Sequence, residues 1–325
     1  MRRRTFIAIA SVALSSWPDH GSLALAPRLR VCFMSLAPAS AWEEQVKAFE
    51  AGLAELGYVV GETIAVEYFW AQDGPSMVDI ARRIVESRPD VIIAPASTQV
   101  AIFRQLTTTI PIVFAQHADP IAVGHVTNLA HPGGNISGVS MLLTEMSAKG
   151  LAILRDTVPT MRVVATLWNP STPSHRAVMA SIQATAERLN VRILSTPVET
   201  EDDLPKAFAA MTNEKDVGFL VPSSPLTNSR PVQLAALAHA AHVPGMFANR
   251  ANVVAGGLMS YGANFNYMYK RTATYVDRVI KGERIGNIPV EQASHYELVL
   301  NNRTAHDLGL DIPFAVLALA DEVIE

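Results

Sequence analysis

The sequence predicts an α/β fold of two lobes, each a mostly parallel sheet flanked by helices. Short apolar runs typical of strands alternate with amphipathic segments typical of helices from residue 28 onward. The strand-like runs are rich in Val and Ile throughout, which is typical of parallel strands covered on both faces. The same order of elements restarts near residue 162, which indicates a second lobe of the same architecture.

The first lobe is predicted to alternate four strands with three helices. In the first helix, apolar residues from Trp42 to Leu56 recur at spacings of 4, 3, 4 and 3, so they share one face, and Gly57 follows as a stop signal. The expected strands are 30–36, 63–70, 90–96 and 110–116, and the expected helices are 41–58, 76–88 and 98–106.

The second lobe is predicted to repeat this order after a joint at 131–143. Within the joint, Gly133, Gly134 and Asn135 indicate a tight turn before an extended segment. The expected strands are 162–170, 191–198 and 216–224, and the expected helices are 174–190 and 202–211.

Composition excludes several classes of protein. The net charge is −4, and Lys and Arg are scattered rather than clustered with aromatic residues, so we expect no nucleic-acid surface. Beyond the N-terminus no apolar run approaches the ~20 residues that span a bilayer, so we expect no stable membrane insertion of the mature chain. The single cysteine, Cys32, cannot form an intramolecular disulfide.

Residues 1–27 have the features of an export signal. Three arginines precede a short apolar stretch, which is typical of secretory signals. Residues 3–7, Arg-Arg-Thr-Phe-Ile, further resemble the twin-arginine export motif. The competing interpretation is a disordered basic tail. We expect export to the periplasm, and the arginine pair indicates the twin-arginine route.

Small polar residues follow three of the predicted strands. They occur in the segments 94–98, 168–172 and 221–225, which read APAST, WNPST and VPSSP. In open α/β sheets, ligands bind beyond the carboxyl ends of the strands. Helix N-termini at these positions would present unpaired N–H groups suited to a carboxylate or another anion. Two such lobes facing each other would form a binding cleft.

Several longer segments together resemble a known family. They are 48–68, 109–124, 129–140, 167–175, 255–262, 271–283, 288–310 and 320–325. With them, the chain from about 28 to 325 resembles the substrate-binding proteins of ABC transporters, in the subgroup related to tryptophan- and tyrosine-binding lipoproteins.

The resemblance implies a type I periplasmic-binding fold with two Rossmann-like lobes. Three hinge crossings are then expected near 138–145, 256–263 and 286–296. Lobe 1 would comprise 28–142 and 260–290, and lobe 2 would comprise 143–259 and 291–325.

The implied ligand is an amino acid, often aromatic or branched, or a related carboxylate, and the implied partners are ABC permease subunits. A periplasmic ligand-sensing subunit for a membrane receptor is an alternative, and a doubly wound enzyme is a second one.

The candidate ligand contacts come from the cleft loops and the expected hinge. Most have a structural alternative: a helix cap for Ser97 or Thr98 and for Asp119, turn roles in 169–171 and 223–224, and core packing for Phe247. Tyr261, in the expected hinge, is the predicted contact for a ligand ring. The full set is Ser97, Thr98, Asp119, Ser140, Asn169, Ser171, Ser223, Ser224, Phe247, Tyr261 and Asn264.

No catalytic, metal or cofactor site is predicted. His117 with Asp119, or His131, meets no metal-ligand spacing, and no G-x-S-x-G elbow supplies a nucleophile. The glycines at 133–134 precede a strand, whereas a dinucleotide fingerprint follows one and opens a helix. The sequence therefore favours a binding protein over an enzyme.

Overall fold

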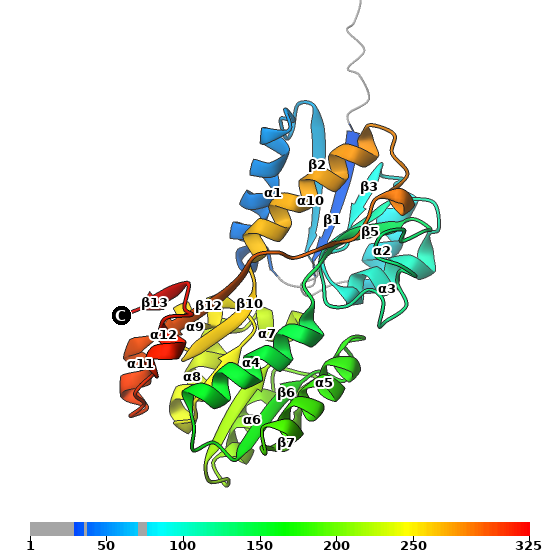
Figure 1. The fold of residues 1–325 in the computed structure, drawn as a ribbon. Helices are drawn as coiled ribbons and strands as arrows, with labels where there is room; N and C mark the ends of the chain where they lie inside the picture. The colour runs from blue at the N-terminus through cyan, green and yellow to red at the C-terminus, as the bar shows by residue number, and fades with distance from the viewer. Residues whose placement is uncertain (1–28, 36–37, 71–76) are drawn as a thin grey trace, which may run out of the picture.

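The molecule has two α/β lobes, each built on its own sheet (Figure 1). The computed structural model describes residues 29–35, 38–70 and 77–325. The predicted export signal, residues 1–27, lies outside the described residues. The predicted fold class is confirmed, since both sheets are mostly parallel and flanked by helices.

Lobe 1 is built on a six-stranded sheet in the order β11-β5-β4-β3-β1-β2, and all its pairs are parallel. Its strands are β1 (Leu29–Ser35), β2 (Ile64–Trp70), β3 (Val91–Ile93), β4 (Ile112–His117), β5 (Ile136–Ser140) and β11 (Glu291–Gln292). Its helices are α1 (Glu43–Glu55), α2 (Met77–Glu86), α3 (Ser97–Leu106) and α10 (Phe265–Ile280), with short 3-10 turns at Ala39–Ala41 and Ile285–Asn287.

Alternation along β1 explains how this sheet is covered on both faces. Val31 and Phe33 pack with residues of α1 and α10, whereas Cys32 and Met34 pack with residues of α2 and α3. All four side chains are fully buried. Because successive strand residues point to opposite faces, a run of apolar residues serves two helix layers at once.

Lobe 2 is built on a seven-stranded sheet in the order β13-β12-β10-β9-β8-β6-β7, in which β10 and β12 are antiparallel. Its strands are β6 (Val163–Trp168), β7 (Arg192–Pro197), β8 (Val217–Val221), β9 (Gly245–Phe247), β10 (Met259–Ala263), β12 (Tyr296–Asn301) and β13 (Glu322–Ile324). Its helices are α4 (Leu143–Thr157), α5 (His175–Arg188), α6 (Asp203–Met211), α7 (Pro225–Asn228), α8 (Pro231–Ala241), α9 (Arg250–Val254), α11 (Asn302–Asp307) and α12 (Phe314–Leu317).

The chain crosses between the lobes three times. It passes from β5 to α4 through Met141 and Leu142, from β10 to α10 at Asn264, and from β11 to β12 through 293–295. The second and third crossings are tied together, because the Asn264 N–H donates to the His295 carbonyl at 2.9 Å.

Strand pairing moves two boundaries that were placed from the sequence. β10 pairs with β9 and β12 as far as Ala263, so lobe 2 continues past the expected boundary at 260. Glu291 and Gln292 pair with β5, so lobe 1 continues past the expected boundary at 291. Both boundaries were expected from the family resemblance, whereas the backbone hydrogen bonds of the two sheets determine where they lie.

Helix α10 returns to lobe 1 and packs closely on α1 (Figure 1). Gly52 makes this approach possible. A Cβ at this position would lie 2.7 Å from the Lys270 carbonyl oxygen and 2.9 Å from the Ala273 Cβ. Two helix backbones can meet this closely only where one side chain is missing.

We predict that Gly52→Ala destabilises the protein by about 1–3 kcal/mol, because the new methyl group forces α1 and α10 apart. The matched control is Gly150→Ala in α4, where the nearest atoms to the new Cβ belong to side chains, Met246 Cγ at 3.2 Å and Leu220 Cδ1 at 3.8 Å, and not to a helix backbone. Urea denaturation of both variants measures the difference. A Gly52→Ala variant as stable as the wild type would contradict the packing argument.

Candidate functional site

A narrow cavity lies between the lobes, and its walls come from loops at the carboxyl ends of strands in both sheets. Its two adjoining parts enclose about 450 and 300 Å³ of space free of protein atoms, partly continuous with solvent. We call it the interlobe cavity. It is lined by Ala41, Trp42, Gln45, Ala96, Ser97, Thr98, Gln99, Gln116, Ala118, Met141, Thr172, Ser223, Ser224, Pro225, Asn228, Ser229, Asn249 and Phe265.

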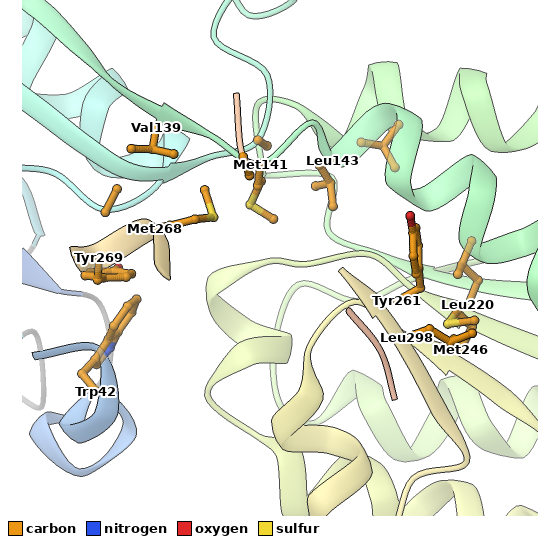
Figure 2. Packing of buried hydrophobic residues seen from close by; sticks show 14 of the residues in the cluster. Trp42, Val139, Met141, Leu143, Leu220, Met246, Tyr261, Met268, Tyr269 and Leu298 are labelled. Carbon is orange, nitrogen blue, oxygen red and sulfur yellow. The ribbon is translucent and has the colours of Figure 1, made fainter. Parts of the chain in front are cut away.

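Two aromatic side chains form part of the wall. Trp42 precedes α1, and its ring lies 5.6 Å from that of Tyr269 and 6.3 Å from that of Phe33. Figure 2 shows Trp42 beside Tyr269 of α10. Phe265, the first residue of α10, lines the same part of the cavity from the second crossing. The packing fixes the Trp42 ring, so the cavity has a preformed apolar surface.

Three buried polar atoms on this wall lack a hydrogen-bond partner. They are the Trp42 indole Nε1 and the Gln99 and Gln116 amide oxygens Oε1. The three side chains are only 8%, 1% and 5% exposed. A buried polar group typically costs ~1–3 kcal/mol unless a ligand or a water molecule satisfies it. Other such atoms occur elsewhere in the described residues, but three of them lie around this one cavity. Their convergence on one cavity indicates a binding site.

The described residues that line the cavity include no charged side chain. Charged residues occur instead at its wider mouth, where Glu43, Glu44, Arg250 and Glu297 contribute. Arg250 is paired there with Glu322 at 2.7 Å. The inner surface therefore offers amides, hydroxyls and aromatic rings to a ligand.

In lobe 1 a chain of hydrogen bonds holds the loop at the cavity floor. The Ala118 N–H donates to Ser97 Oγ at 3.3 Å, and Ser97 Oγ lies 3.2 Å from His117 Nδ1. His117 Nε2 lies 2.8 Å from His125 Nδ1. Burial holds the pKa of His117 well below its ordinary value. Burial, with a smaller effect of Arg104, lowers the pKa of His125 to about 4.

In lobe 2 a single buried histidine joins two of the cavity loops. The Asn169 N–H donates to His175 Nδ1 at 2.9 Å, and His175 Nε2 lies 2.9 Å from the Ser223 carbonyl oxygen. Nδ1 must be unprotonated to accept, so Nε2 carries the hydrogen and donates to Ser223. Burial lowers the pKa of His175 to about 4. Neutral His175 therefore fixes the relative position of two loops.

The four sequence-predicted residues of lobe 1 differ in their surroundings. Ser97 lines the cavity, but its hydroxyl is engaged with His117 and Ala118. Thr98 also lines the cavity, and no hydrogen bond joins its hydroxyl to another described residue. Asp119 accepts from the Ala122 N–H at 2.9 Å, but residues 120–124 form a turn and not a helix, so this hydrogen bond closes a turn instead of capping a helix. Ser140 is buried at the first crossing, outside the residues that line the cavity.

In lobe 2, local turns use most of the predicted hydroxyls and amides. The Asn169 side chain accepts from the Ser171 N–H at 2.8 Å, and Ser171 Oγ donates to Glu199 at 3.1 Å. Ser224 caps α7 in a reciprocal capping box with Thr227. Ser223 lines the cavity and is hydrogen-bonded to Asn228. These contacts reflect turn geometry, which spacing alone does not reveal.

The remaining three predicted residues lie away from the interlobe cavity. Phe247 is fully buried in the lobe 2 core against Phe219. Tyr261 lines another small cavity, and Figure 2 shows it beside Leu220 and Met246 of lobe 2. Lys149 Nζ lies 4.8 Å from the centre of its ring. Asn264 caps α10 and borders only the mouth. Tyr261 lies within β10, which stays paired with β12 as far as Ala263, and is therefore part of the lobe 2 sheet and not of a crossing.

Sequence reasoning missed Trp42, Gln99, Gln116, Asn228 and Phe265 as lining residues. Trp42 was assigned to the apolar face of a helix, and the two glutamines lie inside strings assigned to a helix and a strand. The available signal was position for three of them, since Trp42 and Gln99 lie at the start of predicted helices and Gln116 ends a predicted strand.

No metal site is evident within the described ranges, where no group of three or more His, Cys, Asp or Glu side chains could hold an ion. Among the same residues, no helix combines the length and the apolar character needed to span a bilayer.

Two α/β lobes with mostly parallel sheets, three crossings and a polar cavity between the lobes are the architecture of the class of two-lobed solute-binding proteins. A family model described as ABC transporter substrate binding protein matches residues 33–324. The chain belongs to this family, as the sequence resemblance implied.

Relatives of known structure or function agree with this assignment. The chain is 24% identical over 265 residues to a tyrosine-binding protein of Clostridioides difficile, covering 81% of this chain and 76% of the relative. A conserved domain protein from Vibrio cholerae is 26% identical, with a TM-score of 0.83 over 90% of this chain and 99% of that one. An ABC domain from Streptococcus pneumonia in complex with L-Trp is 22% identical, with a TM-score of 0.84 over 91% and 100%.

We predict that the protein loses stability as the pH falls from 6.5 towards 4. His117, His125 and His175 have folded-state pKa values below their ordinary value of 6.5. The unfolded chain therefore binds more protons in this window, so the stability present above pH 6.5 is lost on acidification. Urea denaturation at pH 7.5, 6.5 and 5.0 measures how the free energy of unfolding changes with pH. This range lies above the pH at which most carboxylates titrate.

His125→Gln is the informative variant, because His125 is the least buried of the three histidines. Between pH 6.5 and 5.0, the free energy of unfolding of this variant should fall less steeply than that of the wild type. A wild-type stability that stays flat over this interval would contradict the neutral, buried state of these rings.

Proposed function

We propose that this protein is exported, captures an amino acid or a related carboxylate with an aromatic or branched side chain in the interlobe cavity, and delivers it to an ABC permease. The observation that carries the proposal is the convergence of three unpaired buried polar atoms and two aromatic rings on one cavity. This is the composition of a small-molecule site, in which apolar walls are combined with a few polar groups that set orientation.

The aromatic wall supports the ligand class. Trp42 and Phe265 offer ring faces and edges, and aromatic pairs gain ~0.5–1.5 kcal/mol beyond simple burial. The relatives named above include one protein called tyrosine-binding and one solved with L-Trp. A ligand with a planar ring fits both the wall and these relatives.

The form of the cavity supports binding by lobe closure. Both lobes supply its walls, and the side chains around its larger part leave only narrow spaces between them. A solute of amino-acid size enters such a space only when the lobes separate. Contacts to both lobes would then favour the closed state, because a ligand shifts an equilibrium only by its difference in affinity for the two states.

Phe265→Ala should weaken binding of L-tryptophan and L-tyrosine by about 1–3 kcal/mol, because the ligand ring loses one apolar wall. Phe265 is only partly buried, so its truncation should spare the fold. The matched control is Phe314→Ala, which removes a ring that is 84% exposed on α12. Isothermal titration calorimetry compares the variants. Equal affinities for wild type and Phe265→Ala would place the ligand elsewhere.

Export rests on the N-terminal sequence. Residues 1–27, fused to a reporter protein that folds before transport, should carry it out of the cytoplasm. Replacing Arg3 and Arg4 by Lys should block this transport, and fractionation of cells measures the outcome. A reporter retained in the cytoplasm with both native arginines present would contradict the proposal.

A further inference from the structure

We propose that Leu142 is a strained pivot in the first crossing, which opposes closure of the lobes and thereby lowers the affinity for the solute. Its backbone is left-handed while the lobes lie close together, and it leaves this conformation when they separate. Leu142 is not one of the described residues that line the interlobe cavity, so it acts without touching the solute. The inference rests on the proposed function, because it requires lobes that close on a solute.

The backbone of Leu142 is unusual for its position. It is the N-cap of α4, with φ of 49° and ψ of 45°, whereas an N-cap residue is typically extended. In the left-handed conformation the Cβ atom lies too close to the following carbonyl oxygen, which disfavours leucine strongly. Four other non-glycine residues among those described have positive φ, and three of them follow the last turn of a helix, where this conformation is common: Arg88, Asn190 and His242. A leucine at the start of a helix has no such local reason for it.

Hydrogen bonds to lobe 1 impose this conformation. The Met141 N–H donates to the His117 carbonyl at 2.8 Å, and the Leu143 N–H donates to the Ala118 carbonyl at 3.1 Å. The residues on both sides of Leu142 are thus fixed to two consecutive carbonyls at the end of β4, and the chain must turn from β5 into α4 between them. A strained residue persists only where the surrounding contacts hold it in this way.

One of these hydrogen bonds joins the two lobes. Leu143 is the first residue of α4 and belongs to lobe 2, whereas Ala118 belongs to lobe 1 and lines the interlobe cavity. The Ala118 N–H also donates to Ser97 Oγ at 3.3 Å, at the floor of the cavity. A rotation that carries α4 away from Ala118 breaks the contact that holds Leu142, so its backbone is free to return to negative φ.

The first crossing offers few residues that can take up this rotation. It consists of Met141 and Leu142 between the end of β5 and the start of α4, and Figure 2 shows Met141 and Leu143 on the segment that joins the lobes. Met141 is buried in the core and is hydrogen-bonded to His117, whereas Leu142 is only partly buried. The change in backbone angles at this crossing is therefore concentrated at Leu142.

Strain that is confined to the closed state acts on the equilibrium between open and closed lobes. It favours open lobes in the absence of a solute, and part of the binding free energy must then offset it. The apparent affinity is reduced by the fraction of molecules that are ready to bind. Removing the strain should therefore tighten binding without a change in any ligand contact.

Calorimetry with L-tryptophan tests the inference on two variants of this one position. In Leu142→Gly the strain disappears, because glycine adopts positive and negative φ with similar ease. Leu142→Ala removes almost the same side chain but keeps the Cβ atom, so it keeps the strain and corrects for the lost packing. Leu142→Gly should bind L-tryptophan roughly 5- to 30-fold more tightly than Leu142→Ala, as expected from the cost of the left-handed conformation.

Two further variants complete the comparison. Leu142→Asn should also bind L-tryptophan more tightly than Leu142→Ala, because asparagine tolerates the left-handed conformation, and it replaces the glycine variant if that one does not fold. The control is His242→Gly. His242 ends α8 with φ of 53°, so glycine relieves the same kind of strain inside lobe 2, away from the crossings. It should leave the affinity for L-tryptophan unchanged.

Small-angle X-ray scattering without solute gives a readout that requires no ligand. Leu142→Gly should have a smaller radius of gyration than Leu142→Ala, because more of its molecules are closed. If wild type binds L-tryptophan and Leu142→Gly binds it no more tightly than Leu142→Ala, the inference is overturned while the proposed function stands. If wild type binds neither L-tryptophan nor L-tyrosine, the proposed ligand class fails. Equal radii of gyration then overturn the inference as well, whereas a smaller radius for Leu142→Gly still supports it.

Discussion

The structure depends on one constraint: polar groups at the carboxyl ends of parallel strands must find partners where two lobes exclude water. Lobe 1 satisfies its groups through Ser97, His117 and His125, and lobe 2 does so through His175 and the capping box of Ser224. Among the described residues that line the interlobe cavity, the fully buried side-chain atoms left without a partner are Nε1 of Trp42 and Oε1 of Gln99 and Gln116. The proposed ligand site is therefore the part of the cavity where the protein does not satisfy its own hydrogen bonds.

Hydrogen bonds also determine how the crossings between the lobes are attached. Three short crossings join the lobes, and hydrogen bonds anchor two of them to lobe 1. Arg271 of α10 pairs with Glu291 of β11 at 2.8 Å, and the Tyr275 hydroxyl donates to the Pro289 carbonyl at 2.8 Å. These contacts join α10 and β11 to lobe 1, so that Asn264 and residues 293–295 link this unit to lobe 2. We propose that the backbone of these linking residues changes when the lobes close. A few residues at element ends are enough for hinge closure.

The sequence predicted the architecture well because periodicity reports burial. Val and Ile runs located the strands, and helix faces such as the one containing Phe49 and Leu53 are buried as expected. The sequence predicted the location of the cleft but not most of the side chains that line it. Whether a loop side chain faces a cavity depends on turn geometry, and Asn169, Ser171 and Ser224 make local contacts instead. The placement of Tyr261 depends on how far β10 stays paired with its neighbours, which the sequence does not show. A buried glutamine such as Gln116 has no sequence signature that separates it from a surface one.

The central claim, that a solute closes the two lobes on the interlobe cavity, is tested most directly by a distance across its mouth. The native Cys32 is fully buried, with a pKa raised to about 11 by burial, so spin labels would react with introduced cysteines instead. Glu44→Cys and Val232→Cys place exposed labels on opposite lobes near the mouth. Pulsed electron resonance should show a shorter, narrower distance distribution when L-tryptophan is added at saturating concentration. An unchanged distribution under calorimetrically confirmed binding would contradict the account.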